Sequence, residues 1–234
     1  CSSDLIRNID LNLSGSSDRI QYYASVAKYD QEGIVAPGKS NFSRLSTRLN
    51  TTVKATDRLK IGWNAAYTHN QSMTVAENTE FGSPLGRALN MDPITPLYET
   101  DPNLLSQGPY SVGGTLRKNL VRDAGGIYGI SSRVTSEIVN PVAALLTDNS
   151  SGWSDKVVNN TYGEYELAKG LKFRSSIGVE LAFYGRNGFR PSYYLNATNY
   201  LDTNLVWQNF NRAMTWIWDN TLAYSKQFGK HSID

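Results

Sequence analysis

The sequence contains little cysteine or histidine: one cysteine, Cys1, and two histidines, His69 and His231, among 234 residues. A single cysteine cannot form an internal disulfide. The histidines lie far apart and have no cysteine partner, so the usual spacings of zinc sites and catalytic triads have no candidates. We therefore predict a protein that is not an enzyme and has no metal or cofactor, with a structural or interfacial role for His69.

Long apolar runs and an excess of charge of one sign are also missing. No segment approaches the roughly 20 apolar residues of a membrane-spanning helix. The net charge is +2 with both signs interspersed, which gives no basic patch for nucleic acid. A transmembrane β-barrel needs no apolar run, because only alternate residues of its strands face lipid. The negative mean hydropathy of −0.42 is therefore compatible with a membrane barrel.

Alternation of apolar and polar residues is the strongest pattern present. In 59–68, Leu59, Ile61 and Trp63 fall on one face, while Lys60 and Asn64 fall on the other. This period of two is typical of a β-strand. Similar segments recur along the chain, and several are at least twice as long as the usual strand of about six residues. The sequence predicts an all-β fold, an antiparallel meander of about eight long strands.

The connections between these strands alternate in length. Short turns occur at 55–58 and 169–170, whereas long loops occupy 73–158 and 187–208. Outer-membrane barrels have this asymmetry, with short periplasmic turns and long extracellular loops. We therefore expect 6–234 to be part of a larger transmembrane β-barrel, with edge strands that pair with strands outside this sequence and with the two long loops extracellular. An isolated chain should then require detergent.

Two other architectures remain open. One is a small stand-alone outer-membrane barrel. The other is a soluble β-sandwich that serves as a carbohydrate-binding module, which would have shorter strands and would bury Leu45, Ile61 and Ile177 in one core. On the barrel hypothesis Leu45, Ile61 and Trp63 face lipid instead.

The first five residues do not fit the strand pattern. We interpret 1–5 as an adapter or cloning scar. A lipoprotein anchor on Cys1 is the alternative, since a mature lipoprotein begins with cysteine followed by a small polar tether. The sequence has no initiating methionine and is interpreted as a fragment.

Several short segments, in order along the chain, resemble the barrel of SusC/RagA-type TonB-dependent outer-membrane transporters. No single segment is decisive, but their occurrence in the family's order is strong evidence for the resemblance. They are SGSSD (14–18), QYYAS (21–25), YDQEGIV (29–35), FSRLSTRLN (42–50), LKIG (59–62), NPVA (140–143) and KGLKF (169–173).

The resemblance implies a barrel of about 22 strands in the outer membrane, plugged by an N-terminal domain. It implies import of oligosaccharides or peptides, energised through the TonB complex and assisted by a SusD-like surface lipoprotein. This chain departs from the family in lacking the plug and the TonB-contacting segment, so it would be a mid-barrel piece in contact with the lipid bilayer.

Candidate binding residues lie on the polar strand faces and in the loops, since loops carry binding while the sheet supplies rigidity. The lumen-facing candidates are Arg44, Arg48, Lys60, Asn64, Lys172, Arg174 and Glu180. The candidates for contact with a sugar or the lipoprotein are the loop tyrosines Tyr98, Tyr110, Tyr128, Tyr193, Tyr194 and Tyr200. Packing against the plug or within the loops is the alternative for each. The loop acids Asp92, Glu99 and Asp101 are a weaker candidate for calcium.

Overall fold

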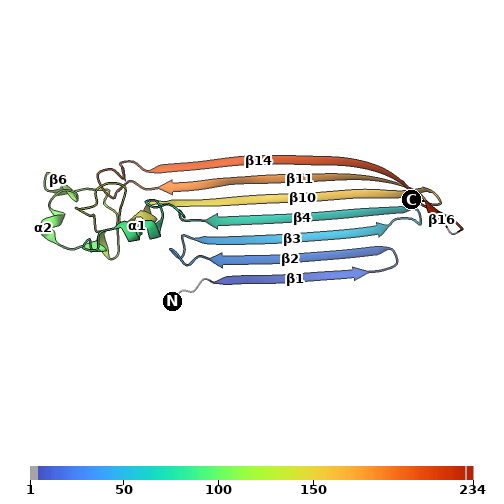
Figure 1. Ribbon diagram of the computed structural model, residues 1–234, viewed down its shortest axis with the longest axis horizontal. Coiled ribbons are helices and arrows are strands. Elements are labelled where there is room, and N and C mark those ends of the chain that lie inside the picture. The colour runs from blue at the N-terminus through green and yellow to red at the C-terminus, as the bar shows by residue number, and fades with distance from the viewer. Residues whose placement is uncertain (1–4, 230, 234) are drawn as a thin grey trace.

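The computed structural model describes residues 5–229 and 231–233. One seven-stranded antiparallel sheet dominates it, with the strands side by side in chain order (Figure 1). The strands are β1 (Ile6–Ser16), β2 (Ile20–Glu32), β3 (Asn41–Lys54), β4 (Leu59–Met73), β10 (Asn149–Ala168), β11 (Leu171–Arg190) and β14 (Leu205–Tyr224). The predicted antiparallel meander is confirmed, with seven strands in this sheet where about eight were expected.

After β14 the chain forms a separate hairpin. β15 (Lys226–Phe228) pairs with β16 (His231–Ile233), and Gly229 between them has a φ of 60°. Because β16 pairs back onto β15, it does not extend the main sheet.

The strands that border the long loops extend further than expected. The first long loop was expected to extend to residue 158, but β10 already begins at Asn149, which opposes Phe189 in β11. Asn, Asp and Gly in this segment are depleted in strands, but pairing with β11, and from Gly152 with β4, overrides that preference. The long connections are therefore 74–148 and 191–204.

Short turns and long connections lie at opposite ends of the sheet (Figure 1). The turn between β10 and β11 contains Gly170, whose φ of 83° is in the left-handed region. The remaining helices and strands belong to 74–148 and 191–204, which we call the loop unit. They are α1 (Pro84–Asn90), β5 (Tyr98–Glu99), α2 (Pro102–Leu105), β6 (Ser111–Val112), β7 (Thr115–Leu116), β8 (Arg122–Asp123), β9 (Gly126–Tyr128), α3 (Pro141–Thr147), β12 (Tyr193–Tyr194) and β13 (Tyr200–Leu201).

Three of the prolines in this region start helices. Each of the three helices begins with proline and follows a residue whose side chain accepts backbone N–H groups: Ser83, Asp101 or Asn140. Proline lacks an N–H and has a helical φ, so it is favoured at this position, and the capping side chain satisfies free donors of the first turn. None of the helices in the described residues is long and apolar enough to cross a bilayer.

The buried core lies in the loop unit. One cluster contains Tyr128, Val139, Ala143, Ala144 and Leu195, and a second contains Tyr110, Leu120 and Tyr194. The sheet is a single layer, in which Leu45, Ile61 and Ile177 are 38%, 42% and 47% exposed. A sandwich that buries these three residues together is therefore excluded for the described chain.

Candidate functional site

The strand register places all of the predicted lumen residues on one face of the sheet. Arg48 opposes Ala66, Ala66 opposes Val158, and Val158 opposes Glu180. Opposed residues in an antiparallel sheet project to the same side, and the other candidates lie an even number of positions away on the same strands. This polar face carries Arg44, Arg48, Lys60, Asn64, Lys172, Arg174 and Glu180.

Three of these residues, Glu180, Lys172 and Arg174, contact side chains of the neighbouring strand β10 on the polar face. Glu180 Oε1 lies 2.8 Å from the Nζ of Lys156, a residue that the sequence did not single out. The Nζ of Lys172 lies 3.9 Å from Glu164 Oε1. The guanidinium of Arg174 stacks 3.8 Å from the centre of the Tyr162 ring. Exposed pairs of this kind contribute up to about 1 kcal/mol each.

The opposite face is apolar. Tyr67, Val157, Leu181 and Met214 form one transverse row across β4, β10, β11 and β14. At the loop end this face becomes polar: the Nδ1 of His69 lies 2.8 Å from Asp155 Oδ1, which also accepts the Tyr67 hydroxyl. His69 thus has a partner from the adjacent strand.

Most of the predicted loop tyrosines pack inside the loop unit. Tyr110, Tyr128 and Tyr194 are buried, and Tyr98 and Tyr193 pack against the first cluster. Only Tyr200 is more than half exposed, at 51%. The burial of Tyr110, Tyr128 and Tyr194 favours internal loop packing, which was the alternative to ligand contact.

Hydrogen bonds hold these tyrosines in place. The hydroxyls of Tyr98 and Tyr128 donate to Asp123 at 3.0 and 2.6 Å. The backbone N–H of Ile130 donates to the Tyr110 hydroxyl at 2.7 Å. Burial raises the pKa of Tyr110 to about 12, and burial, followed by the Asp123 hydrogen bond, raises the pKa of Tyr128 above its ordinary value. Both rings therefore remain neutral at physiological pH.

The two long loops fold together, which no pattern in the sequence predicted. The N–H of Tyr194 donates to the carbonyl oxygen of Asn119 at 2.6 Å, and the Asn119 amide donates to the Tyr193 carbonyl at 3.2 Å. Arg117 lies 4.1 Å from the centre of the Tyr194 ring. The only sequence signal was the concentration of Asn and Tyr in 193–200.

The loop acids considered for calcium cap their own turns. Asp92 accepts from the backbone N–H of Thr95 at 2.9 Å and from the Ser131 hydroxyl, which is the main cause of the lowered pKa of Asp92. Glu99 accepts from two backbone N–H groups, and Asp101 caps α2. In the described residues no three acidic, histidine or cysteine side chains are grouped as metal ligands.

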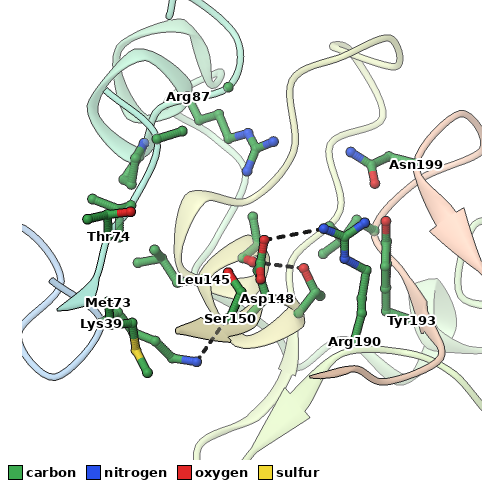
Figure 2. A pocket seen from close by; sticks show the side chains of 17 residues that line it. Lys39, Met73, Thr74, Arg87, Leu145, Asp148, Ser150, Arg190, Tyr193 and Asn199 are labelled. Atoms are coloured by element: carbon green, nitrogen blue, oxygen red, sulfur yellow. Dashed lines mark hydrogen bonds and ion pairs between the residues drawn. The ribbon is translucent and has the colours of Figure 1, made fainter. Parts of the chain in front are cut away.

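A cavity of about 320 Å³ lies where the loop unit meets the sheet, and we call it the junction pocket (Figure 2). Lys39 from the β2–β3 loop, Arg87 from α1 and Arg190 from the end of β11 approach it from three sides. Asp148, which directly follows α3, supplies the one carboxylate of the lining. Neutral polar side chains in the lining are Thr74, Thr147, Ser150, Tyr193 and Asn199.

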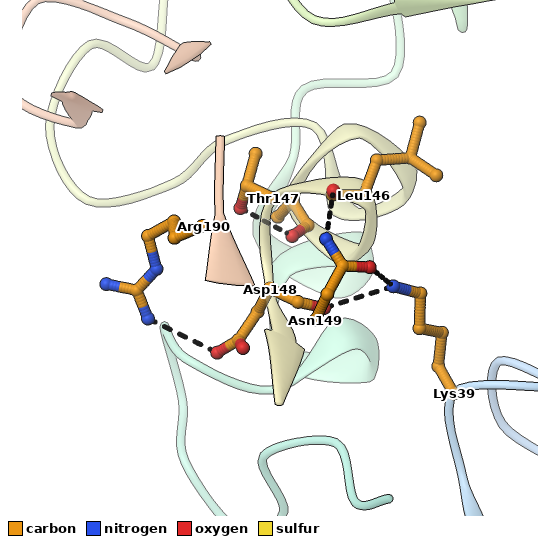
Figure 3. Close-up of polar contacts among 7 residues, drawn as sticks. Lys39, Leu146, Thr147, Asp148, Asn149 and Arg190 are labelled. Atoms are coloured by element: carbon orange, nitrogen blue, oxygen red, sulfur yellow. Dashed lines mark hydrogen bonds and ion pairs between the residues drawn. The ribbon is translucent and has the colours of Figure 1, made fainter. Parts of the chain in front are cut away.

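Of the three cations in the junction pocket, Arg190 is paired with a carboxylate, whereas Lys39 and Arg87 donate to neutral oxygens. Figure 3 shows the contacts of Arg190 and Lys39. Arg190 Nη2 lies 3.2 Å from Asp148 Oδ2. The ammonium of Lys39 donates to the Asp148 carbonyl oxygen at 3.0 Å and to the side-chain oxygen of Asn149. Arg87 Nε donates to the Phe81 carbonyl oxygen at 2.9 Å. None of these cations was a sequence candidate, because segments far apart in the chain bring them together.

Comparisons with known proteins cover nearly the whole chain. No protein-family model matches it. TonB-dependent receptor P3 of Formosa agariphila is 27% identical over 229 residues, which is 97% of this chain and 20% of that receptor. TonB-dependent receptor SusC of Bacteroides thetaiotaomicron is 26% identical over 208 residues, which is 80% of this chain and 19% of SusC.

Solved structures show the same fold. A chain of the RagAB peptide importer in its closed-closed state superimposes with a TM-score of 0.63 at 20% identity, over 94% of this chain and 22% of that one. The open-open state gives a TM-score of 0.61. The chain thus spans about a fifth of the length of the curated relatives it matches.

Proposed function

Because these similarities support a SusC/RagA-type TonB-dependent transporter, at modest identity, we propose that this chain forms part of the barrel wall of an outer-membrane importer. The imported solutes are oligosaccharides or peptides, and the energy comes through the TonB complex. The protein to which the chain contributes is a transporter and not an enzyme.

The observation that carries this proposal is the division of a single-layer sheet into two unlike faces. In the central portions of β3, β4 and β11 the apolar face presents no Lys, Arg, Asp or Glu, while the opposite face carries most of the charge of the sheet. The charged residues Lys28, Asp155 and Arg212 of the apolar face lie in one transverse row toward the loop end. An Arg or Lys near the bilayer midplane on a lipid-facing side costs about 2–4 kcal/mol. The arrangement therefore favours lipid on the apolar face and a polar lumen behind the other.

Strand length supports the same orientation. β10, β11 and β14 each have 20 residues. At a rise of about 3.3 Å per residue a strand of this length spans roughly 66 Å. Even with a tilt of about 40°, it exceeds the apolar band of about 25 Å of an outer-membrane barrel. The excess raises the loop unit above the bilayer, on the extracellular side in our proposal.

The loop unit is the proposed contact for a SusD-like surface lipoprotein. Leu85 and Leu89 on α1 and Ile94 beyond it are strongly exposed. A partner above the barrel mouth would cover these side chains. The exposed loop tyrosine Tyr200 remains a proposed contact for cargo or lipoprotein, and the polar face remains the proposed lumen wall.

The test uses the full-length transporter that contains this chain. Its gene is deleted, and the strain is grown on single glycans or on peptides as the carbon source. We expect loss of growth on one substrate class, restored by a plasmid copy but not by a copy that lacks the TonB-contacting segment. Unchanged uptake of every substrate, or restoration by both copies, would contradict TonB-dependent import. Affinity purification from mild detergent should co-purify the lipoprotein.

A further inference from the structure

We propose that the junction pocket binds a carboxylate group of the imported solute, with Arg87 and Arg190 as its charged partners. This inference rests on the proposed import function and specifies its substrate class: uronate-containing oligosaccharides, or peptides through a free carboxylate. Both present the same planar, singly charged oxyanion.

The first argument is the charge of the pocket. Its lining contains three cationic side chains and one carboxylate. Asp148 is paired with Arg190. Among the described residues no carboxylate lies within ion-pair distance of Lys39 or Arg87, whose side chains donate to neutral oxygens instead. A pocket with this excess of positive charge attracts an anion.

Arg87 supplies the second argument. Its side chain points into the cavity in Figure 2. Burial lowers the pKa of its guanidinium from the ordinary value, although arginine stays protonated in proteins. A half-buried cation is less favourable without a carboxylate partner than with one. A ligand carboxylate beside Arg87 would supply the missing negative charge.

The geometry of the arginine donors and the volume of the cavity limit which ligands can bind. Arginine presents parallel N–H donors that match the two oxygens of a carboxylate. Tyr193 and Asn199 line the same cavity and provide neutral hydrogen-bonding groups for hydroxyls or a peptide bond. A volume of about 320 Å³ is at the lower end for small-molecule sites, which suits one sugar acid or one terminal residue of a longer solute.

Asp148 is the one acidic side chain that lines the junction pocket. Its carboxylate holds Arg190 at 3.2 Å and would repel a second carboxylate in the pocket. Asp148→Asn keeps the size of the side chain and removes the repulsion. The proposal therefore predicts one variant that gains affinity, an outcome that misfolding cannot produce.

The experiment measures binding to the purified full-length transporter in detergent by calorimetry at low ionic strength. The probes are trigalacturonic acid with its methyl ester, and an acetylated alanine tripeptide with its C-terminal amide. We expect at least one acid to bind about tenfold more tightly than its neutral counterpart, as charge-assisted hydrogen bonds allow. The pair that discriminates identifies the source of the carboxylate.

Variants assign the effect to the pocket. Arg87→Gln and Arg190→Gln should each abolish most of the preference for the acid, and Asp148→Asn should increase it. Arg122→Gln is the matched control, because it removes one positive charge from an exposed position on β8, outside the pocket lining. It should leave the preference unchanged.

The results separate this inference from the import function. Equal affinities for acid and neutral probes in both pairs, or an equal loss in Arg87→Gln and Arg122→Gln, overturn the carboxylate site even if growth tests confirm import. Conversely, acid discrimination that follows the variants as expected supports the site even if import fails.

Discussion

The side-chain amide of Asn196 donates to the carbonyl oxygen of Ser136 at 2.8 Å across 60 positions of the chain. The same amide reaches the carbonyl of Ile138 at 3.3 Å, while the side-chain oxygen of Asn196 accepts from the backbone N–H of Thr198 and Asn199. Asn196 is buried and joins the second long loop to the first. The two loops therefore act as one folded unit above the sheet.

Asn196→Ala should loosen that unit. The substitution leaves buried carbonyl and N–H groups without partners, which costs about 1–3 kcal/mol. We expect faster backbone hydrogen exchange in 136–139 and 191–204, with unchanged exchange in the sheet. Asn103→Ala, at an exposed position on α2, is the control. Equal exchange in the two variants would show that Asn196 does not join the loops.

An arginine on the apolar face should destabilise the barrel, and the same residue one position away should not. Ile177 projects from the apolar face and Ser176 from the polar face. In the full-length protein Ile177→Arg should lower the free energy of unfolding by about 2–4 kcal/mol if it lies near the midplane, and Ser176→Arg by much less. The measurement is urea unfolding in lipid vesicles. Equal effects at both positions would argue against a lipid-facing side.

Gly170 should tolerate no side chain. Its φ is 83°, and a Cβ there would lie 2.2 Å from the carbonyl oxygen of Ser225. Gly170→Ala should therefore cost about 1–2 kcal/mol or more, from the left-handed backbone alone. Gly163→Ala is the matched control, because a Cβ at Gly163 meets no atom within 4 Å. Thermal unfolding of the two variants compares them, and equal midpoints would contradict this account of the turn.

Alkaline pH should destabilise the loop unit through Tyr110. Burial raises the pKa of this phenol from 10.0 to about 12, so the folded chain keeps a proton that the unfolded chain loses. The resulting stabilisation is complete below pH 10 and disappears as the pH rises from about 10 to 12. Tyr110→Phe should reduce this pH dependence, measured by hydrogen exchange of the second core cluster. Tyr200→Phe, with a half-exposed ring, should leave it unchanged.

The strand pattern predicted much of the architecture. The period of two placed Arg48 and Glu180 on one face and Leu45 and Ile61 on the other, as the register shows. The resemblance to SusC/RagA-type transporters is confirmed by the comparisons at modest identity. The loop tyrosines were candidates for contact with a sugar or the lipoprotein, with internal packing as the alternative, and Tyr110 and Tyr128 are among those that are buried.

The junction pocket could not be predicted from the sequence, because the residues that form it come from distant parts of the chain. Lys39 and Asn149 lie 110 positions apart, and Asp148 and Arg190 lie 42 apart, so no local spacing records their contact. In the strands, side-chain direction follows from position alone, because successive residues alternate between the two faces of the pleat. The sequence by itself therefore determined which residues share a face. Strand ends, the joining of the loops and the charged pocket were decided only by the tertiary structure, because each depends on pairing between segments distant in the chain.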